Sequence, residues 1–284
     1  MTPYTGVSVL EVSKDKVDKV HQDGKIEIWD NRHTFYPNQF VYLKSVEGQT
    51  GVITVVNNNF LKKVNDKLKL FGIKAKNKEQ KMAMSVLADN SVPLCVLTGK
   101  AGTGKTLISL AAALQAVEDG NYDRILITRP MSQVGKYNLG ALPGTVDEKF
   151  GPYLENYLNN IQQLIGNDSA TAEILQQQMN ITAMPLQLIR GASWVRTFVI
   201  ADEVQTLDHD EMLTLGTRIG EGSKLVVLGD LRQRDEKIAK VNTGLYKLMN
   251  DPKAKKSPLI SAIELIKCER SPLSALIAEI FEDE

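Results

Sequence analysis

The chain has 284 residues, enough for about two domains or for one large core with an appendage. Apolar residues make up 43% and charged residues 24%, a balance that excludes wholesale disorder and a collagen-like chain. The 34 basic residues cancel the 34 acidic ones, so affinity for a polyanion has to come from a local patch. The cysteines and histidines lack a metal-binding spacing, and the sequence shows neither a signal peptide nor a membrane span. We therefore expect a cytoplasmic protein without a membrane partner.

The first 60 residues predict a small β-rich module. Short apolar or alternating runs that are typical of strands occupy residues 6–12, 25–29, 39–44 and 51–56. Turn-forming residues separate them, and one helix is predicted near residues 13–22.

A basic stretch follows this module. Residues 62–81 hold eight lysines against Asp66 and Glu79, a local charge of about +6. The pattern fits a solvated helix face with a linker as well as it fits a patch that contacts nucleic-acid phosphates.

Beyond residue 77 the pattern indicates an α/β fold. Continuous apolar runs at residues 93–98, 124–128, 197–202 and 224–230 alternate with longer amphipathic stretches, which predicts a parallel sheet covered by helices on both faces. The first of these helices carries an apolar stripe, and residues 153–184 read as polar helix with loops. The stripe consists of Leu107, Leu110, Leu114 and Val117.

The strongest motif is GKAGTGKT at residues 99–106, a complete G-x-x-x-x-G-K-[ST] phosphate loop between a predicted strand and a predicted helix. Its glycines let successive backbone N–H groups face a phosphate, and the N-terminus of the helix adds a partial positive charge. Lys105 is expected to bridge the β- and γ-phosphates, while the Thr106 hydroxyl holds Mg²⁺. The motif thus predicts ATP and Mg²⁺ as ligands, bound by Gly99, Ala101, Gly102, Thr103, Gly104, Lys105 and Thr106.

Two carboxylates end a later apolar strand. Asp202 and Glu203 follow residues 197–201, where a metal ligand and a water-activating base are needed beside the γ-phosphate. A lone Asp-Glu pair would be interpreted as the start of a loop, but the phosphate loop upstream favours hydrolysis. We expect Asp202 to bind the metal and Glu203 to act as the base.

Two glutamines are further candidates. Gln233 lies just beyond the strand at residues 224–228 and can sense the γ-phosphate or the attacking water. Gln80 lies about twenty residues before the phosphate loop, where its amide can read the adenine edge. The alternative for this segment is a helix cap at Asn77 followed by a solvated glutamine.

Many motifs in the same order resemble the PhoH family of ATPases across residues 70–275. The resemblance rests on EQ at 79–80, GKAGTGKT at 99–106, ITRP at 127–130, LGALPGTVDEKFGP at 139–152, PLQLIRG at 185–191, FVIADEVQ at 198–205, TRIGEGSK at 217–224, GDLRQRD at 229–235 and ERSPL at 269–273.

The resemblance implies a RecA-like P-loop core similar to the first motor domain of superfamily-one helicases. In that core DEAQ follows the carboxylate strand and GD-x-x-Q is the sensor; here Val204 replaces the alanine. Residues 1–72 resemble the segment that joins a PIN ribonuclease domain to the ATPase in fused members, and residues 73–284 form the ATPase domain. We expect no PIN domain in this chain, and the nuclease activity of the fused members is therefore not expected of it.

The resemblance also implies an oligomer. Such helicases complete the nucleotide site with an arginine from a second RecA-like core, and this chain holds one core. An arginine finger contributes about 10³ to 10⁵ in rate, so a neighbouring subunit is the expected donor. Contacts of that kind close into rings, which favours a homo-oligomer, most plausibly a hexamer. Candidates for the finger are Arg270, Arg218 and Arg129, each of which can instead be a structural or same-subunit phosphate contact.

These features favour an ATP-driven motor on single-stranded nucleic acid, with RNA favoured over DNA by the resemblance alone. Lys253, Lys255 and Lys256 would add phosphate contacts to those of the basic stretch. The alternative is a nucleotide-gated assembly module that switches a protein partner. A small-molecule phosphotransferase ranks last, because the paired carboxylates and the sensor favour water as the attacking group.

Overall fold

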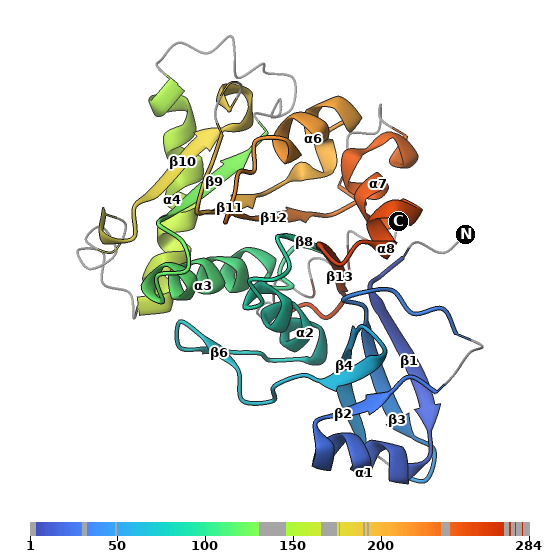
Figure 1. The fold of residues 1–284 in the computed structure, drawn as a ribbon. Coiled ribbons are helices and arrows are strands. Elements are labelled where there is room, and N and C mark those ends of the chain that lie inside the picture. The colour runs from blue at the N-terminus through green and yellow to red at the C-terminus, as the bar shows by residue number, and fades with distance from the viewer. Residues whose placement is uncertain are drawn as a thin grey trace.

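The chain folds around two separate β-sheets, one from each end of the sequence (Figure 1). A computed structural model gives this fold. The structure describes residues 4–29, 33–48, 50–130, 146–165, 175, 177–189, 191, 193–233 and 239–269, with residues 273, 276 and 280.

The first sheet forms a β-rich unit, here called the N-terminal module (residues 7–63). One helix, α1 (Lys14–Asp23), packs on it and buries Val17 and Val20 completely. The strand order is β1-β3-β4-β5-β2, which confirms the predicted β-rich start of the chain. The strands are β1 (Val7–Val12), β2 (Lys25–Glu27), β3 (Phe40–Ser45), β4 (Gly51–Asn57) and β5 (Phe60–Lys63).

In the basic stretch only the last four residues are helical, so the alternative of a helix face with a linker holds for its end alone. The stretch contains β5, a small hairpin of β6 (Lys69–Leu70) and β7 (Ile73–Lys74), and the first turn of α2 (Lys78–Leu87). Glycine at position 72, with φ of 79°, makes the hairpin turn that a helix would not contain.

Part of the charge in this stretch is used within the fold. Asp66 pairs with Lys81 at 2.9 Å and with Lys63 at 3.5 Å. The ammonium of Lys78 lies 3.7 Å from the centre of the Tyr42 ring, a cation–π distance. Lys63, Lys78 and Lys81 are therefore partly engaged within the fold, and the other lysines of the stretch stay available to a polyanion.

The second sheet has six parallel strands in the order β10-β9-β11-β12-β8-β13. Its four central strands were predicted, and its two edge strands were not. The strands are β8 (Leu94–Gly99), β9 (Arg124–Arg129), β10 (Ile181–Pro185), β11 (Thr197–Ala201), β12 (Lys224–Gly229) and β13 (Ile260–Leu265). Edge strands have one neighbour and tolerate polar residues such as Thr182 and Glu264, so they lack the continuous apolar run.

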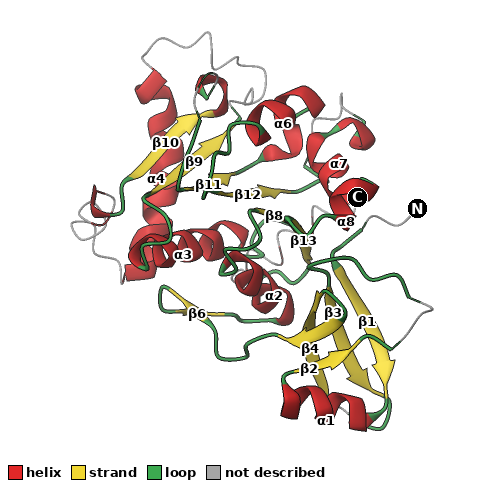
Figure 2. Cartoon of the chain, viewed as in Figure 1, coloured by secondary structure: helices red, strands yellow, loops and turns green. Residues whose placement is uncertain are grey.

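Helices cover both faces of this sheet, as predicted (Figure 2). One face carries α2, α3 (Lys105–Glu118) and α4 (Val146–Ile165); the other carries α6 (His209–Gly216) and α7 (Gly244–Asn250), with α8 (Pro252–Lys256) after it. The short turns η2 (Leu186–Leu188), η3 (Val204–Thr206) and η4 (Lys240–Asn242) complete this α/β core. Among the described residues, no helix is long and apolar enough to cross a membrane.

Alternating strand residues divide the interior into two apolar layers. Cys95 and Leu97 of β8 face the α2–α3 side, whereas Val96 between them faces the α6–α7 side. The same alternation recurs in β9, β11 and β12, because successive side chains on a strand point to opposite faces.

Helix α3 differs from its predicted one-sided packing. Leu110 and Leu114 of the stripe are buried, but Leu107 and Val117 are only partly so. Small residues such as Ala111 and Ala112 are buried as well, since the helix is enclosed by the sheet, α2 and α4. A helix buried on nearly every side anchors the phosphate loop that precedes it.

The N-terminal module is joined to the α/β core along β13. Thr5 accepts a backbone hydrogen bond from Glu264 at 3.0 Å, and any side chain at Gly6 would collide with the carbonyl oxygen of Ala262. Asn38 donates through Nδ2 to the carbonyl of Pro258 at 2.7 Å. These contacts fix the module beside the start of β13.

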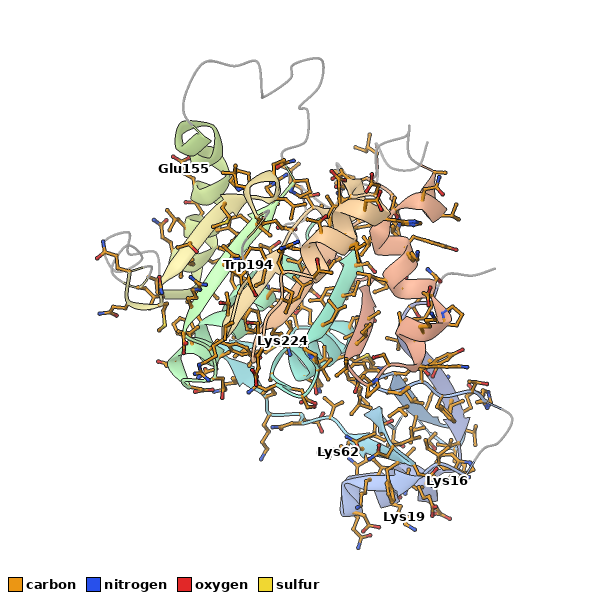
Figure 3. The ribbon with its side chains drawn as sticks, turned by 45° about the horizontal axis from the view of Figure 1, so that its top comes forward. Lys16, Lys19, Lys62, Glu155, Trp194 and Lys224 are labelled. Carbon is orange, nitrogen blue, oxygen red and sulfur yellow. The ribbon has the colours of Figure 1, made fainter. Side chains whose placement is uncertain are left out.

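Helix α2 is held at both of its ends. Asn77 caps the N-terminus by accepting from the Gln80 N–H at 2.8 Å, which confirms the predicted helix cap. At the C-terminus, the fully buried Lys224 donates to the carbonyls of Val86 at 2.9 Å and Asp89 at 2.8 Å. In Figure 3 this lysine lies inside the core.

Replacing Lys224 by Met should lower the free energy of unfolding by about 1 to 3 kcal/mol, because the carbonyls of Val86 and Asp89 would lose the ammonium donor and keep only weaker bonds from neighbouring groups. Urea unfolding measures the change. Lys62→Met, at an exposed lysine of β5, is the control and should leave the midpoint in place. Equal midpoints for the two variants would contradict the capping role.

Candidate functional site

The order of the strands brings the two main motifs together. The phosphate loop follows β8 and the carboxylates follow β11, with β12 between these strands. All three strands are parallel, so their carboxyl ends meet at one edge of the sheet, where ligands of open α/β folds bind.

The shape of the phosphate loop requires glycine. Gly104, with φ of 90°, directly precedes α3, and a side chain there would meet Nε2 of Gln80. Gly99 has φ of 143°, and a side chain would collide with the carbonyl oxygen of Leu265 in β13. The loop therefore brings its backbone N–H groups to the N-terminus of a 14-residue helix, a site that favours phosphate.

Lys105 extends over this loop. Its Nζ donates to the carbonyls of Gly99 at 2.6 Å and Lys100 at 3.0 Å. These bonds hold the ammonium group on the inner side of the loop, where the sequence predicts that it meets the β- and γ-phosphates.

Thr106 and Asp202 lie side by side, although 96 residues separate them in the sequence. The Thr106 hydroxyl donates to Oδ2 of Asp202 at 3.2 Å. A hydroxyl and a carboxylate beside a phosphate site are the hard oxygen donors that Mg²⁺ prefers. The residues present therefore fit the predicted metal.

Tyr157 of α4 is part of the site, and the sequence prediction missed it. Its hydroxyl is buried and donates to the same Oδ2 of Asp202 at 3.0 Å. The only available signal was spacing: Tyr157, Ile161 and Leu164 lie on one helix face, which marks Tyr157 as pointing inward. That spacing does not reveal which group the hydroxyl meets.

The charges around Asp202 favour a bound cation. Burial raises the pKa of Asp202, and the neighbouring Glu203 carboxylate raises it further. Burial and Asp202 raise the pKa of Tyr157 well above its usual value, so the phenol remains a donor. Arg129, at the end of β9, lowers the pKa of both groups and so lies within electrostatic range of the pair.

Glu203 occupies a backbone conformation that is unusual for its residue type. Its φ of 58° is left-handed, and such strain is common at functional sites. Its Oε2 accepts from Nε2 of Gln205 at 2.6 Å, and Oε1 of Gln205 accepts from the Asp230 N–H at 3.2 Å. Gln205, buried to 2% exposure, thus connects the carboxylate to the end of β12, a role that was not predicted from the sequence.

Gln80 lies beneath the phosphate loop and is not solvated. Its Nε2 donates to the Thr103 carbonyl at 3.0 Å, its Oε1 accepts from the Lys76 N–H at 2.9 Å, and only 5% of the residue is exposed. The structure therefore gives this side chain a part in shaping the loop. Recognition of adenine by Gln80 stays a prediction.

Gln233 lies just past β12, as predicted, with an exposed side chain. Its backbone N–H donates to the Asp230 carbonyl at 3.0 Å in the turn that follows the strand. Its role as a sensor of the γ-phosphate stays a prediction.

The three candidate arginines lie in different places. Arg129 is beside the carboxylates, as described above. Arg218 bonds through its carbonyl to the N–H of Trp194, which precedes β11, so it lies at the amino edge of the sheet, opposite the phosphate loop. That position argues against phosphate contact within its own subunit and leaves a structural role or contact across an interface, which stays a prediction. Arg270 lies outside the described residues.

The segment after β13 runs along the outer side of the loop. The Glu269 N–H donates to the Gly102 carbonyl at 2.9 Å, and the Glu269 carboxylate accepts from Nδ2 of Asn77 at 2.8 Å. This hydrogen bond is the main reason that the pKa of Glu269 is lowered. The loop is therefore enclosed between α2 and the end of the core.

Comparison with known proteins agrees with this geometry. A family model described as PhoH-like protein matches residues 72–282. "Protein PhoH2" of Bacillus subtilis is 36% identical over 98% of this chain and 64% of its own, and its namesake from Mycolicibacterium smegmatis is 32% identical over 99% and 63%. The chain thus spans just under two thirds of the length of these relatives.

Among solved structures, the SWI2/SNF2 ATPase core of Sulfolobus solfataricus in complex with double-stranded DNA has a TM-score of 0.40 at 16% identity, covering 68% of this chain and 40% of its own. The family match covers the phosphate loop, both carboxylates and most of the α/β core. The chain therefore belongs to the PhoH family.

Proposed function

We propose that this chain binds ATP with Mg²⁺ at the carboxyl edge of its six-stranded sheet and hydrolyses it to drive work on single-stranded nucleic acid. The observation that carries the proposal is the contact between Thr106 and Asp202, which joins the phosphate loop to the carboxylate strand. Lys105 and Glu203 lie directly beside these two residues in the sequence.

The proposed reaction assigns one task to each group. The loop N–H groups and Lys105 hold the β- and γ-phosphates, while Thr106 and Asp202 would hold the metal. Mg²⁺, when bound, neutralises and orients the phosphate oxygens. Glu203 accepts a proton from water as the water oxygen bonds to the γ-phosphorus and the bond to the β–γ bridging oxygen breaks. ADP and phosphate leave, and the Gln205 hydrogen bond keeps the base in place.

Two features support coupling to nucleic acid. Gln205 links the base to the turn after β12, so a change at the γ-phosphate can reach a surface turn. Exposed lysines remain on the basic stretch and on α8, among them Lys62, Lys67, Lys69, Lys74, Lys76, Lys253 and Lys256. RNA is favoured over DNA by the family resemblance. The alternative, a nucleotide-gated module that switches a protein partner, uses the same site without these lysines.

ATP turnover should rise when a 12-nucleotide uridine or thymidine strand (U12 or dT12) is added at low salt, and the gain should shrink as salt rises because lysine–phosphate contacts release counterions. Phosphate release measures turnover.

Glu203→Gln should retain ATP but lose about 10²- to 10⁴-fold in turnover, whereas Lys105→Ala should lose ATP binding. Glu221→Gln, at an exposed carboxylate, is the control. A rate of ATP turnover that is unchanged by either strand would favour the protein-switching alternative.

Tyr157→Phe should raise the Mg²⁺ concentration for half-maximal turnover roughly tenfold, because the hydroxyl that orients Asp202 is removed. Calorimetry should show weaker ATP binding with Mg²⁺ and unchanged binding without it. Tyr122→Phe, whose hydroxyl bonds to Asn90 away from the site, should change neither. An equal loss with and without Mg²⁺ would indicate a packing defect instead.

We further propose a homo-oligomeric ring, hexameric by resemblance, in which Arg218 or Arg270 completes the neighbouring site. Alanine at the true finger should lower turnover while ATP affinity is retained. Mixing that variant with Glu203→Gln should restore activity at about a quarter of the sites, where an intact base meets an intact arginine. Mixtures as inactive as their parents would contradict donation across the interface, and a monomeric mass would contradict the ring.

A further inference from the structure

A cleft of about 850 Å³ separates the N-terminal module from the α/β core. On the module side, the turn between β4 and β5 (residues 57–59) lines it together with His33 and Phe35. On the core side, Pro258 and Leu259 line it just before β13 begins. The cleft thus lies at the amino edge of the six-stranded sheet, opposite the phosphate loop, and is a separate site.

The walls of the cleft are fixed relative to each other. Asn38 of the module bonds through Nδ2 to the carbonyls of Pro258 at 2.7 Å and Ile260 at 3.1 Å, and its own carbonyl accepts from the Ser261 hydroxyl at 3.2 Å. A pocket held by hydrogen bonds from both sides is largely formed before any ligand arrives.

The lining has the chemistry that binds a nucleobase. The rings of His33 and Phe35 lie 6.2 Å apart and tilted by 35°, and Leu259 is 56% exposed beside them, so flat and apolar surfaces are available for stacking. The side chains of residues 57–59 are three exposed amides, and those of Asn57 and Asn58 offer both donors and acceptors to base edges, while Asn59 donates to Glu27. The described residues that line the cleft include no aspartate or glutamate, although the Glu27 carboxylate accepts a hydrogen bond from one lining amide, Nδ2 of Asn59, at 2.9 Å.

Positive charge lies close in the chain to the core wall of the cleft. Lys253 and Lys256 of α8 are exposed and precede the lining residue Pro258 by five and two residues. Stacking surfaces beside lysines are the combination by which proteins bind single strands, in which bases stack and phosphates meet ammonium groups.

We propose that this cleft binds the bases of a single-stranded nucleic acid, with the phosphates directed toward the lysines of α8. This inference takes its partner, single-stranded nucleic acid, from the proposed function, and it adds the surface that the strand contacts. It puts the strand on the opposite edge of the sheet from ATP, so that coupling between the two sites has to cross the core along β8, β12 and β13.

The test measures anisotropy of fluorescein-labelled U12 and dT12 with the full chain at 50 and 200 mM salt. His33→Ala combined with Lys256→Ala should weaken binding about tenfold and reduce the salt dependence. Phe35→Leu, which keeps the apolar packing and removes the ring, should weaken binding severalfold. The control, Lys19→Ala with His21→Ala, removes the same groups from α1, at the end of the module far from the core in Figure 3, and should bind like the parent.

Photocrosslinking of U12 that carries 4-thiouridine should label residues 33–38, 57–59 or 258–259. Parent-like binding by both cleft variants, or labels confined to other segments, would overturn the cleft assignment and leave the proposed function standing. Failure of the parent chain to bind either strand, without stimulation of turnover, would overturn the nucleic-acid function itself. A changed assembly mass in the cleft variant alone would make the cleft a contact between copies and also overturn the proposal. Unchanged unfolding temperatures establish that the variants are folded.

Discussion

Hydrogen bonds from outside the phosphate loop support its shape, in addition to those that Thr103 and Lys105 make within it. The loop has no ladder of its own; Gln80 bonds to the Thr103 carbonyl, and the Glu269 N–H bonds to the Gly102 carbonyl from the other side. Asn77 then joins these two supports by bonding to the Glu269 carboxylate. The phosphate-binding surface therefore depends on α2 and on the segment after β13, and it does not fold independently of them.

The need to hold α2 in place also explains why a lysine, Lys224, is buried in the core. A buried ammonium is costly unless it is hydrogen-bonded, and here it bonds to two carbonyls at the end of α2. The helix is thus fixed at the end that is remote from the loop, while Gln80 acts at the near end. Rigidity of the site is obtained by pinning a neighbouring helix, because the loop itself has to stay open to a ligand.

The sequence predicted the fold class and the central strands because the parallel strands are buried on both faces and read as apolar runs. It also predicted the phosphate loop and the carboxylate pair, whose chemistry is local in the sequence. It did not predict Tyr157 or the bridging role of Gln205, because those roles depend on contacts between segments tens of residues apart. The edge strands β10 and β13 were missed because their polar residues interrupt the pattern. The sequence also could not show which lysines of the basic stretch pair with Asp66, because those contacts depend on the fold.

Gly99 shows that a nucleotide-binding motif can be constrained by architecture as well as by its ligand. A side chain there would strike the Leu265 carbonyl of the adjacent strand. The obstruction is a backbone atom, so no replacement at position 265 could relieve it. A side chain at this first glycine would therefore disturb the fold even in a protein that had no need to bind a nucleotide. A variant at Gly99 that loses function would do so because the pairing of β8 with β13 is disturbed, whether or not a phosphate contact is lost.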